Sequence, residues 1–172
     1  MEVRRKTRVT KVPERRELIV ERMVSIPRSV AWQGWTRPKH VERWWGPRTW
    51  CATVYEMDVR PGGIWRYLLA PENGEGEIAR GMAVYEEVTA PSRLAYTDAF
   101  ADPAWQVVEG SQMPTTVTFE EAGQHTLLTI TTRFGSVADL EAAESTGMIE
   151  GFTDALERLE EYLHNNRKGL ED

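Results

Sequence analysis

The sequence MIEGFTDALERLEEYL, residues 148–163, decides the fold of this chain. Apolar residues recur along it at spacings of three and four, which places them on one face of a helix. These residues are Met148, Phe152, Ala155, Leu156, Leu159, Tyr162 and Leu163. Acidic residues occupy the other faces, and Gly147 and Gly151 weaken the first turns, where a break would fall. The stretch therefore predicts one long amphipathic helix that needs an apolar partner.

The partner is a sheet predicted from the residues before it. Segments rich in β-branched and aromatic residues, several with alternating polarity, predict about seven strands. They lie at 17–26, about 50–59, 64–70, 76–89, 92–101, 112–121 and 125–134. Short loops between successive strands favour an antiparallel meander. Two short helices, ending near Trp35 and Trp45, follow the first strand. We expect an α+β domain in which a curved antiparallel sheet wraps around the C-terminal helix.

The charge is distributed unevenly along the 172 residues. The net charge is −6, yet residues 1–16 carry seven basic and two acidic side chains. This segment has no apolar periodicity, so we expect a flexible basic arm at 1–16, one domain at 17–164 and a tail at 165–172. The acidic body argues against nucleic acid as a partner, because phosphate binding needs a basic face.

The composition also bears on the environment of the protein. No apolar run approaches the 18 or so residues of a membrane-spanning helix, so we expect no transmembrane segment. The single cysteine, Cys51, has no partner for an internal disulfide, which fits a reducing compartment. We therefore expect a cytoplasmic protein.

Several strings, in order along residues 17–164, resemble one known family. They are Ile26-Pro27, Trp44-Trp45-Gly46-Pro47, Asp58-Val59-Arg60-Pro61-Gly62-Gly63, Tyr85-Glu86-Glu87-Val88, Leu94-Ala95-Tyr96-Thr97, Thr116-Val117-Thr118-Phe119-Glu120 and Gly151-Phe152. The series is similar to the SRPBCC (START-like, Bet v-like) superfamily, in the branch named after the activator of heat shock protein 90 ATPase. This resemblance implies a helix-grip fold with a cavity between the sheet and the C-terminal helix. It does not fix a function, because one fold hosts many.

Large flat side chains are unusually frequent, with six of seven tryptophans between residues 32 and 65. Such side chains fill cores, but they also line wide apolar pockets. So many of them facing one helix suggest that they surround a space. The residues that we expect to line this cavity are Trp44, Trp45, Tyr55, Trp65, Tyr67, Tyr96, Met113, Met148 and Phe152.

Chemistry-bearing residues are few and scattered. His40, His125 and His164 are isolated, with no metal-binding spacing around them, so we expect surface histidines, no metal and no cofactor. Asp98 shares a strand face with Tyr96 and Phe100, where a carboxylate is costly unless it is paired or solvated. It is the acid of most interest, but the sequence assigns no catalytic residue.

Three functions of different classes fit these observations. The first is binding of a small hydrophobic or aromatic molecule in the cavity. The second is an aromatase/cyclase-like enzyme acting on a polyketide-like substrate, with proton transfer by a tyrosine, Asp98 or an arginine. The third is a co-chaperone-like protein-binding module, which the branch name suggests. A homodimer and a protein partner are both left open by the sequence.

Overall fold

One curved antiparallel sheet holds all the strands of the part of the chain that the computed structural model describes, residues 7–166. Its strands are β1 (Arg8–Val12), β2 (Glu17–Val24), β3 (Trp50–Met57), β4 (Ile64–Pro71), β5 (Ala79–Thr89), β6 (Arg93–Asp98), β7 (Phe100–Ala101), β8 (Met113–Ala122) and β9 (His125–Arg133). Their order across the sheet is β1-β2-β9-β8-β6-β5-β4-β3, and β7 pairs with β5 beside β6.

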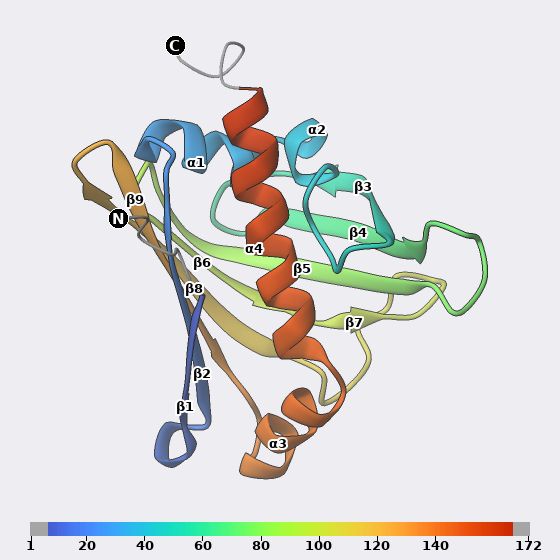
Figure 1. Cartoon of the computed structure of the whole chain (residues 1–172). Coiled ribbons are helices and arrows are strands. Elements are labelled where there is room, and N and C mark those ends of the chain that lie inside the picture. The colour runs from blue at the N-terminus through green and yellow to red at the C-terminus, as the bar shows by residue number, and fades with distance from the viewer. Residues whose placement is uncertain (1–6, 167–172) are drawn as a thin grey trace.

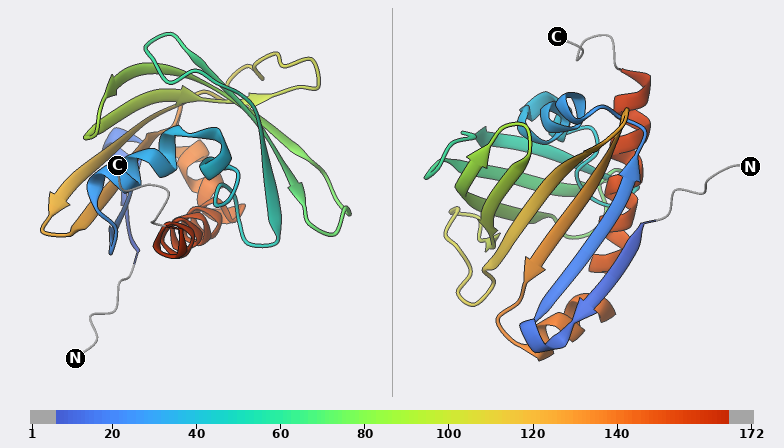
Figure 2. Two further views of the ribbon diagram at one scale, coloured as in Figure 1. Left: turned by 90° about the horizontal axis from the view of Figure 1, so that it is seen from above. Right: turned by 90° about the vertical axis from the view of Figure 1, so that its left-hand side faces the viewer.

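The helices lie on the concave side of this sheet. They are α1 (Arg28–Thr36), α2 (Pro38–Val41), α3 (Val137–Ser145) and α4 (Met148–Asn165); a short 3-10 helix at Pro13–Arg15 lies apart from them, in the connection between β1 and β2. α4 crosses the opening of the arch, with α1 and α2 at one end and α3 at the other (Figures 1 and 2). The α+β fold in which a curved sheet grips the C-terminal helix is thus confirmed.

The apolar face of α4 packs as its spacing predicts. Leu156, Leu159 and Leu163 are at most 1% exposed. α1 approaches α4 closely at Gly34, where an added Cβ would lie only 2.8 Å from Cδ1 of Leu163. Because glycine has no side chain, the two helices come into direct contact and close one end of the interior.

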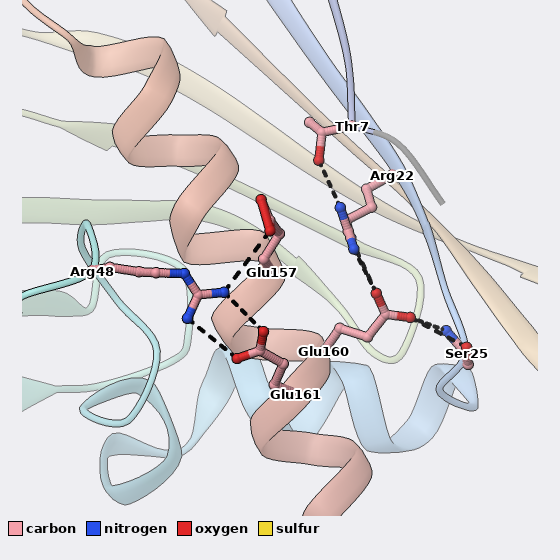
Figure 3. Close-up of polar contacts among 7 residues, drawn as sticks. All are labelled: Thr7, Arg22, Ser25, Arg48, Glu157, Glu160 and Glu161. Atoms are coloured by element: carbon pink, nitrogen blue, oxygen red, sulfur yellow. Dashed lines mark hydrogen bonds and ion pairs between the residues drawn. The ribbon is translucent and has the colours of Figure 1, made fainter. Parts of the chain in front are cut away.

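Ion pairs fasten α4 on two sides (Figure 3). On one side the carboxylate of Glu160 accepts hydrogen bonds from Arg22 and from the backbone N–H of Ser25, each at 2.8 Å. Glu160 and Arg22 are largely buried, so this pair is screened little by solvent. On the other side Arg48 donates to Glu161 at 2.8 Å, in an exposed pair. The helix is therefore tied both to β2 and to the loop before β3.

The prediction of a flexible arm at residues 1–16 is wrong for residues 7–16, the part that the structure describes. β1 pairs along its length with β2, from Arg8 opposite Glu21 to Val12 opposite Glu17. Lys11 also reaches Glu144 of α3 at 2.9 Å. β1 shows no alternating pattern because it is an edge strand with exposed side chains, and its backbone hydrogen bonds, which leave no trace in polarity, hold it. Residues 1–6 lie outside the described residues.

Two further features differ from the prediction. The strand predicted at 92–101 is interrupted at Ala99 and forms β6 and the two-residue β7, and α3, which the sequence did not predict, buries only Leu140 and Ala143. α3 begins with Ser136, whose side chain accepts a hydrogen bond from the N–H of Asp139, a capping pattern visible in the sequence. Gly147, with a positive φ of 86°, separates α3 from α4 where the sequence predicts a break. α4 extends to Asn165, the first residue of the predicted tail; residues 167–172 lie outside the described range.

Candidate functional site

A pocket of about 390 Å³ lies between the concave face of the sheet and the first half of α4. Its walls come from the loop after α2, from strands β3 to β8, and from the junction of α3 with α4. The lining residues are Trp45, Gly46, Pro47, Trp50, Tyr67, Leu69, Ala79, Asp98, Phe100, Met113, Thr146, Gly147, Met148, Gly151, Phe152 and Ala155. Apolar and aromatic side chains dominate this surface, as is usual for sites that bind small organic molecules.

Five of the nine side chains that the sequence predicts for the cavity meet at this pocket. They are Trp45, Tyr67, Met113, Met148 and Phe152. The ring of Trp45 stands nearly perpendicular to two others, at 78° to Tyr67 with centroids 5.5 Å apart and at 77° to Phe152 with centroids 6.2 Å apart. Edge-to-face contacts of this kind are favourable and hold the rings in defined orientations.

Three other predicted side chains lie behind the wall and not on it. Trp44, Trp65 and Tyr96 are each at most 1% exposed and belong to the solid core. Trp44 donates its indole N–H to the carbonyl oxygen of Gly34 at 2.9 Å, which joins the loop after α2 to α1. The ring of Trp65 contacts that of Tyr96 at a centroid distance of 5.8 Å. These residues support the pocket, and the expectation that they line it is wrong.

Tyr55 lies on the opposite face of the sheet, and its prediction as a pocket residue is wrong. The pairing of β3 with β4 shifts by one residue between Val54 and Glu56, so Tyr55 is the extra residue of a β-bulge. The shift leaves Tyr55 60% exposed, with its ring 5.4 Å from that of Trp105. Strict alternation, from which the prediction came, fails at a bulge because every residue beyond it changes face.

Asp98 is the one acidic residue of the pocket lining, and two neighbours hold it. The hydroxyl of Tyr67 donates to its two carboxylate oxygens at 3.0 and 3.2 Å, and the N–H of Ala99 donates at 3.0 Å. Burial raises the pKa of Asp98 to about 7, although both hydrogen bonds act to lower it. Burial, and then the charge of Asp98, raise the pKa of Tyr67 well above its usual value, so Tyr67 stays a neutral donor.

A glycine makes the position of Tyr67 possible. Gly81 of β5 lies directly opposite Tyr67 of β4, and the tyrosine ring covers it so closely that an added Cβ would overlap the ring. The sequence gives no direct sign of this contact, because a glycine inside a strand indicates only a bulge or a close approach. Leu69, by contrast, could have been found from its place two residues after Tyr67 on the same face.

The pocket wall formed by residues 45–50 is fixed from α4 by one arginine. Nη1 of Arg158 donates to the carbonyl oxygens of Gly46 at 2.9 Å and Pro47 at 3.0 Å, with that of Trp50 further away at 3.4 Å, and Nη2 donates to the carbonyl oxygen of Arg43 at 3.4 Å. A guanidinium presents several N–H donors in a fixed plane, so its two terminal nitrogens can satisfy carbonyls on both sides of one loop. Arg158 thus positions the loop that carries Trp45 into the pocket.

A second hollow of about 400 Å³ adjoins the pocket on the side of α3. The two hollows share Phe100, Met113, Thr146 and Met148 in their linings. Methionine is unbranched and adapts its shape easily. Met113 and Met148 therefore border both hollows with side chains that can change shape.

In residues 7–166, no group of three or more His, Cys, Asp or Glu side chains could hold a metal ion. Within the same range, no helix combines the length and apolarity needed to cross a membrane. The prediction that His40 lies at the surface is wrong. This residue is only 7% exposed, and its Nδ1 lies 2.6 Å from the hydroxyl of Tyr162.

A curved antiparallel sheet, a long C-terminal helix against its concave face and a pocket between them define a helix-grip protein. The chain belongs to the family of Activator of Hsp90 ATPase homolog 1-like proteins, whose family model matches residues 25–164. The resemblance found in the sequence to this branch of the SRPBCC superfamily is thus confirmed. The comparison with curated proteins gives no match.

Solved structures of bacterial proteins share this fold. A protein from Arthrobacter aurescens is similar with a TM-score of 0.85 and 29% identity, over 92% of this chain and 91% of that one. Protein Ms6760 from Mycobacterium smegmatis gives a TM-score of 0.83 and 26% identity, over 91% and 96% of the two chains. The AHSA1 protein from Silicibacter pomeroyi, at 19% identity and a TM-score of 0.71 over 87% and 99%, shares the fold.

Proposed function

We propose that this protein binds a small hydrophobic or aromatic molecule in the pocket between the sheet and α4. The observation that carries the proposal is the lining itself, in which aromatic rings and methionines surround a single carboxylate. The volume of about 390 Å³ lies within the range of about 300–1,000 Å³ that is common for sites of this kind. Trp45, Tyr67 and Phe152 would enclose the body of the molecule, and Asp98 would orient its polar end.

A neutral aromatic probe, naphthylmethanol, tests this proposal by isothermal titration calorimetry. Ala79 lines the pocket opposite Leu69, so Ala79→Phe would fill the space and abolish binding. The matched control is Ala70→Phe, one residue after Leu69 on the other face of β4, where the added ring leaves the pocket free. Binding lost in the first variant and kept in the second supports the proposal. Wild-type protein that binds no probe, or Ala79→Phe protein that binds as well as wild type, contradicts it.

The natural ligand would be sought by native mass spectrometry of gently purified protein. The expected result is an additional mass of a few hundred daltons on wild-type protein, consistent with a drug-sized ligand in this pocket. The same preparation of the Ala79→Phe variant would lack it. An additional mass that the Ala79→Phe variant retains would place the ligand elsewhere and contradict the proposal.

A second candidate function is acid–base catalysis in the same pocket, and Asp98 is the observation that favours it. A carboxyl group with a pKa of about 7 exchanges protons readily at neutral pH, and such groups gather at active sites. The enzyme would take a proton from a bound molecule and return it at another position. Proton NMR of phenylacetone in deuterated buffer tests this function, since wild type but not Asp98→Asn would accelerate exchange of the hydrogens beside the carbonyl. Equal rates with and without the protein would remove this candidate.

The remaining expectations from the sequence stay predictions. They are a co-chaperone-like interaction with another protein, a homodimer and a cytoplasmic location. The family name is the only support for the first of these.

A further inference from the structure

Among the described residues that line the pocket, one carries a formal charge, and that charge is negative. Of the sixteen residues that line it, Asp98 is the only one with an acidic or basic group that titrates near neutral pH. None of the sixteen is lysine, arginine or histidine. An anionic molecule such as a fatty acid would therefore bring a second negative charge into a poorly hydrated site, where like charges repel strongly.

Asp98 also has unused capacity to accept hydrogen bonds. Two carboxylate oxygens provide about four acceptor positions, and the neighbours Tyr67 and Ala99 both donate to this side chain. Within residues 7–166, no lysine, arginine or histidine forms an ion pair with Asp98. The groups that act on it from the adjacent strands are the neutral phenols of Tyr67, Tyr85 and Tyr96. A buried carboxylate with neutral neighbours favours a cationic partner.

Aromatic side chains line the same pocket as this carboxylate. The hydroxyl of Tyr67 touches Asp98, and the ring of Trp45 crosses that of Tyr67 at 5.5 Å, with Phe152 beyond it. The faces of aromatic rings attract ammonium groups within about 6 Å of the ring centre. A carboxylate next to such rings is a combination that recognises an organic cation.

We propose that the ligand of this pocket is a hydrophobic amine in its protonated form, with the ammonium group at Asp98 and the apolar body against Trp45 and Phe152. The inference rests on the proposed function and adds the chemical class of the ligand. An ammonium group donates hydrogen bonds to the free positions of Asp98, and its charge replaces the counter-ion that the protein does not provide.

The binding of such an amine depends on pH with a defined sign. The carboxyl group ionises near pH 7, and only its ionised form pairs with the ammonium group. Affinity for the amine therefore rises between pH 6 and pH 8. A neutral ligand of the same shape does not form the ion pair, so its affinity does not rise over this range.

The test compares three probes that share a naphthalene body and differ in charge. Naphthylmethylamine is cationic, naphthylmethanol neutral and naphthoic acid anionic, and each is titrated into the full chain by calorimetry at pH 6 and pH 8. At pH 8 we expect the amine to bind about tenfold more tightly than the alcohol, a difference of about 1.4 kcal/mol, and the acid to bind most weakly. At pH 6 the advantage of the amine should shrink.

Two variants locate the effect. Asp98→Asn removes the charge and should remove the preference for the amine, while binding of the alcohol persists. Tyr67→Phe keeps the carboxylate and should keep the preference. The comparison of the three probes on wild-type protein tests the preference for the amine even if a variant folds poorly.

The outcomes separate this inference from the proposed function. If the alcohol or the acid binds wild-type protein as tightly as the amine, the inference is overturned and the proposed function stands. If no probe binds, both are overturned.

Discussion

The hydroxyl of Tyr67 on β4 donates a hydrogen bond to the carboxylate of Asp98 on β6 at 3.0 Å. The contact passes over β5, which lies between these two strands. This contact makes an acid tolerable inside an otherwise apolar interior, because an ionised carboxylate needs partners for its charge. It also gives the pocket one polar end. The pKa of this carboxyl group and its place in the pocket lining underlie the predictions that follow.

We expect Asp98→Asn to stabilise the protein at high pH. The folded protein holds the Asp98 proton up to a pKa of about 7, whereas the unfolded chain releases it near the ordinary value of 3.8. Between these values the folded state binds more protons, so this group's contribution to stability falls as pH rises through that window and is constant above it. Asparagine does not ionise, so the advantage of the variant over wild type should grow from pH 5 to pH 8.

Urea denaturation at several pH values measures this difference. The control is Glu109→Gln in an exposed loop, which removes one carboxylate without removing a buried charge. If the gain in stability from Asp98→Asn is equal at pH 5 and pH 8, then Asp98 ionises normally, which would contradict the raised pKa of this buried acid.

We expect Gly81→Ala to displace Tyr67. The added methyl group would overlap the tyrosine ring, and overpacking of this kind costs about 1–3 kcal/mol. A double-mutant cycle with Tyr67→Ala provides the control, because removal of the ring makes room for the methyl group. Gly81→Ala should then cost little stability in the Tyr67→Ala protein. Additive losses would mean that the ring does not lie over Gly81.

We expect Arg158→Met to cost more stability than Arg48→Met. Arg158 satisfies carbonyl groups of the loop at residues 46–50, and unsatisfied polar groups cost about 1–3 kcal/mol. Arg48 forms exposed ion pairs with Glu157 and Glu161, which contribute about 1 kcal/mol or less. Calorimetric titration should also show weaker probe binding for Arg158→Met alone. Equal effects of the two substitutions on both quantities would refute the positioning role of Arg158.

We expect Phe152→Ala to destabilise the protein less than Leu159→Ala. Phe152 borders the pocket and has fewer contacts to lose, so its truncation should cost about 1–2 kcal/mol. Leu159 is 1% exposed in the contact of α4 with α1, where truncation costs about 2–5 kcal/mol. Urea denaturation of both variants makes the comparison. A greater loss for Phe152→Ala would indicate a solid interior at this position.

The fold could be predicted from the sequence because its main signals are periodic. The three- and four-residue spacing of Leu156, Leu159 and Leu163 defines the buried face of α4, and the same spacing places Met148 and Phe152 at the pocket. The unusual position of Asp98 on an apolar strand face also pointed to a partner, which the structure identifies as Tyr67.

The errors arose where backbone geometry has no signature in side-chain polarity. The bulge after Val54 turns Tyr55 outward, and a single sequence does not reveal an extra residue in a strand. β1 is held by its ladder to β2, with exposed side chains that show no pattern. Periodicity also gives the face of a residue but not its depth, so Trp44, Trp65 and Tyr96 could not be distinguished from true lining residues.

Methyl NMR of the methionines tests most directly the central claim that the interior pocket receives an apolar molecule. Met113 and Met148 line the pocket, whereas Met23 of β2 and Met82 of β5 are not part of its lining and serve as internal controls. On titration with naphthylmethanol we predict saturable shifts of the Met113 and Met148 signals, with Met23 and Met82 unchanged. Shifts confined to Met23 or Met82, or no shift at all, would contradict the account.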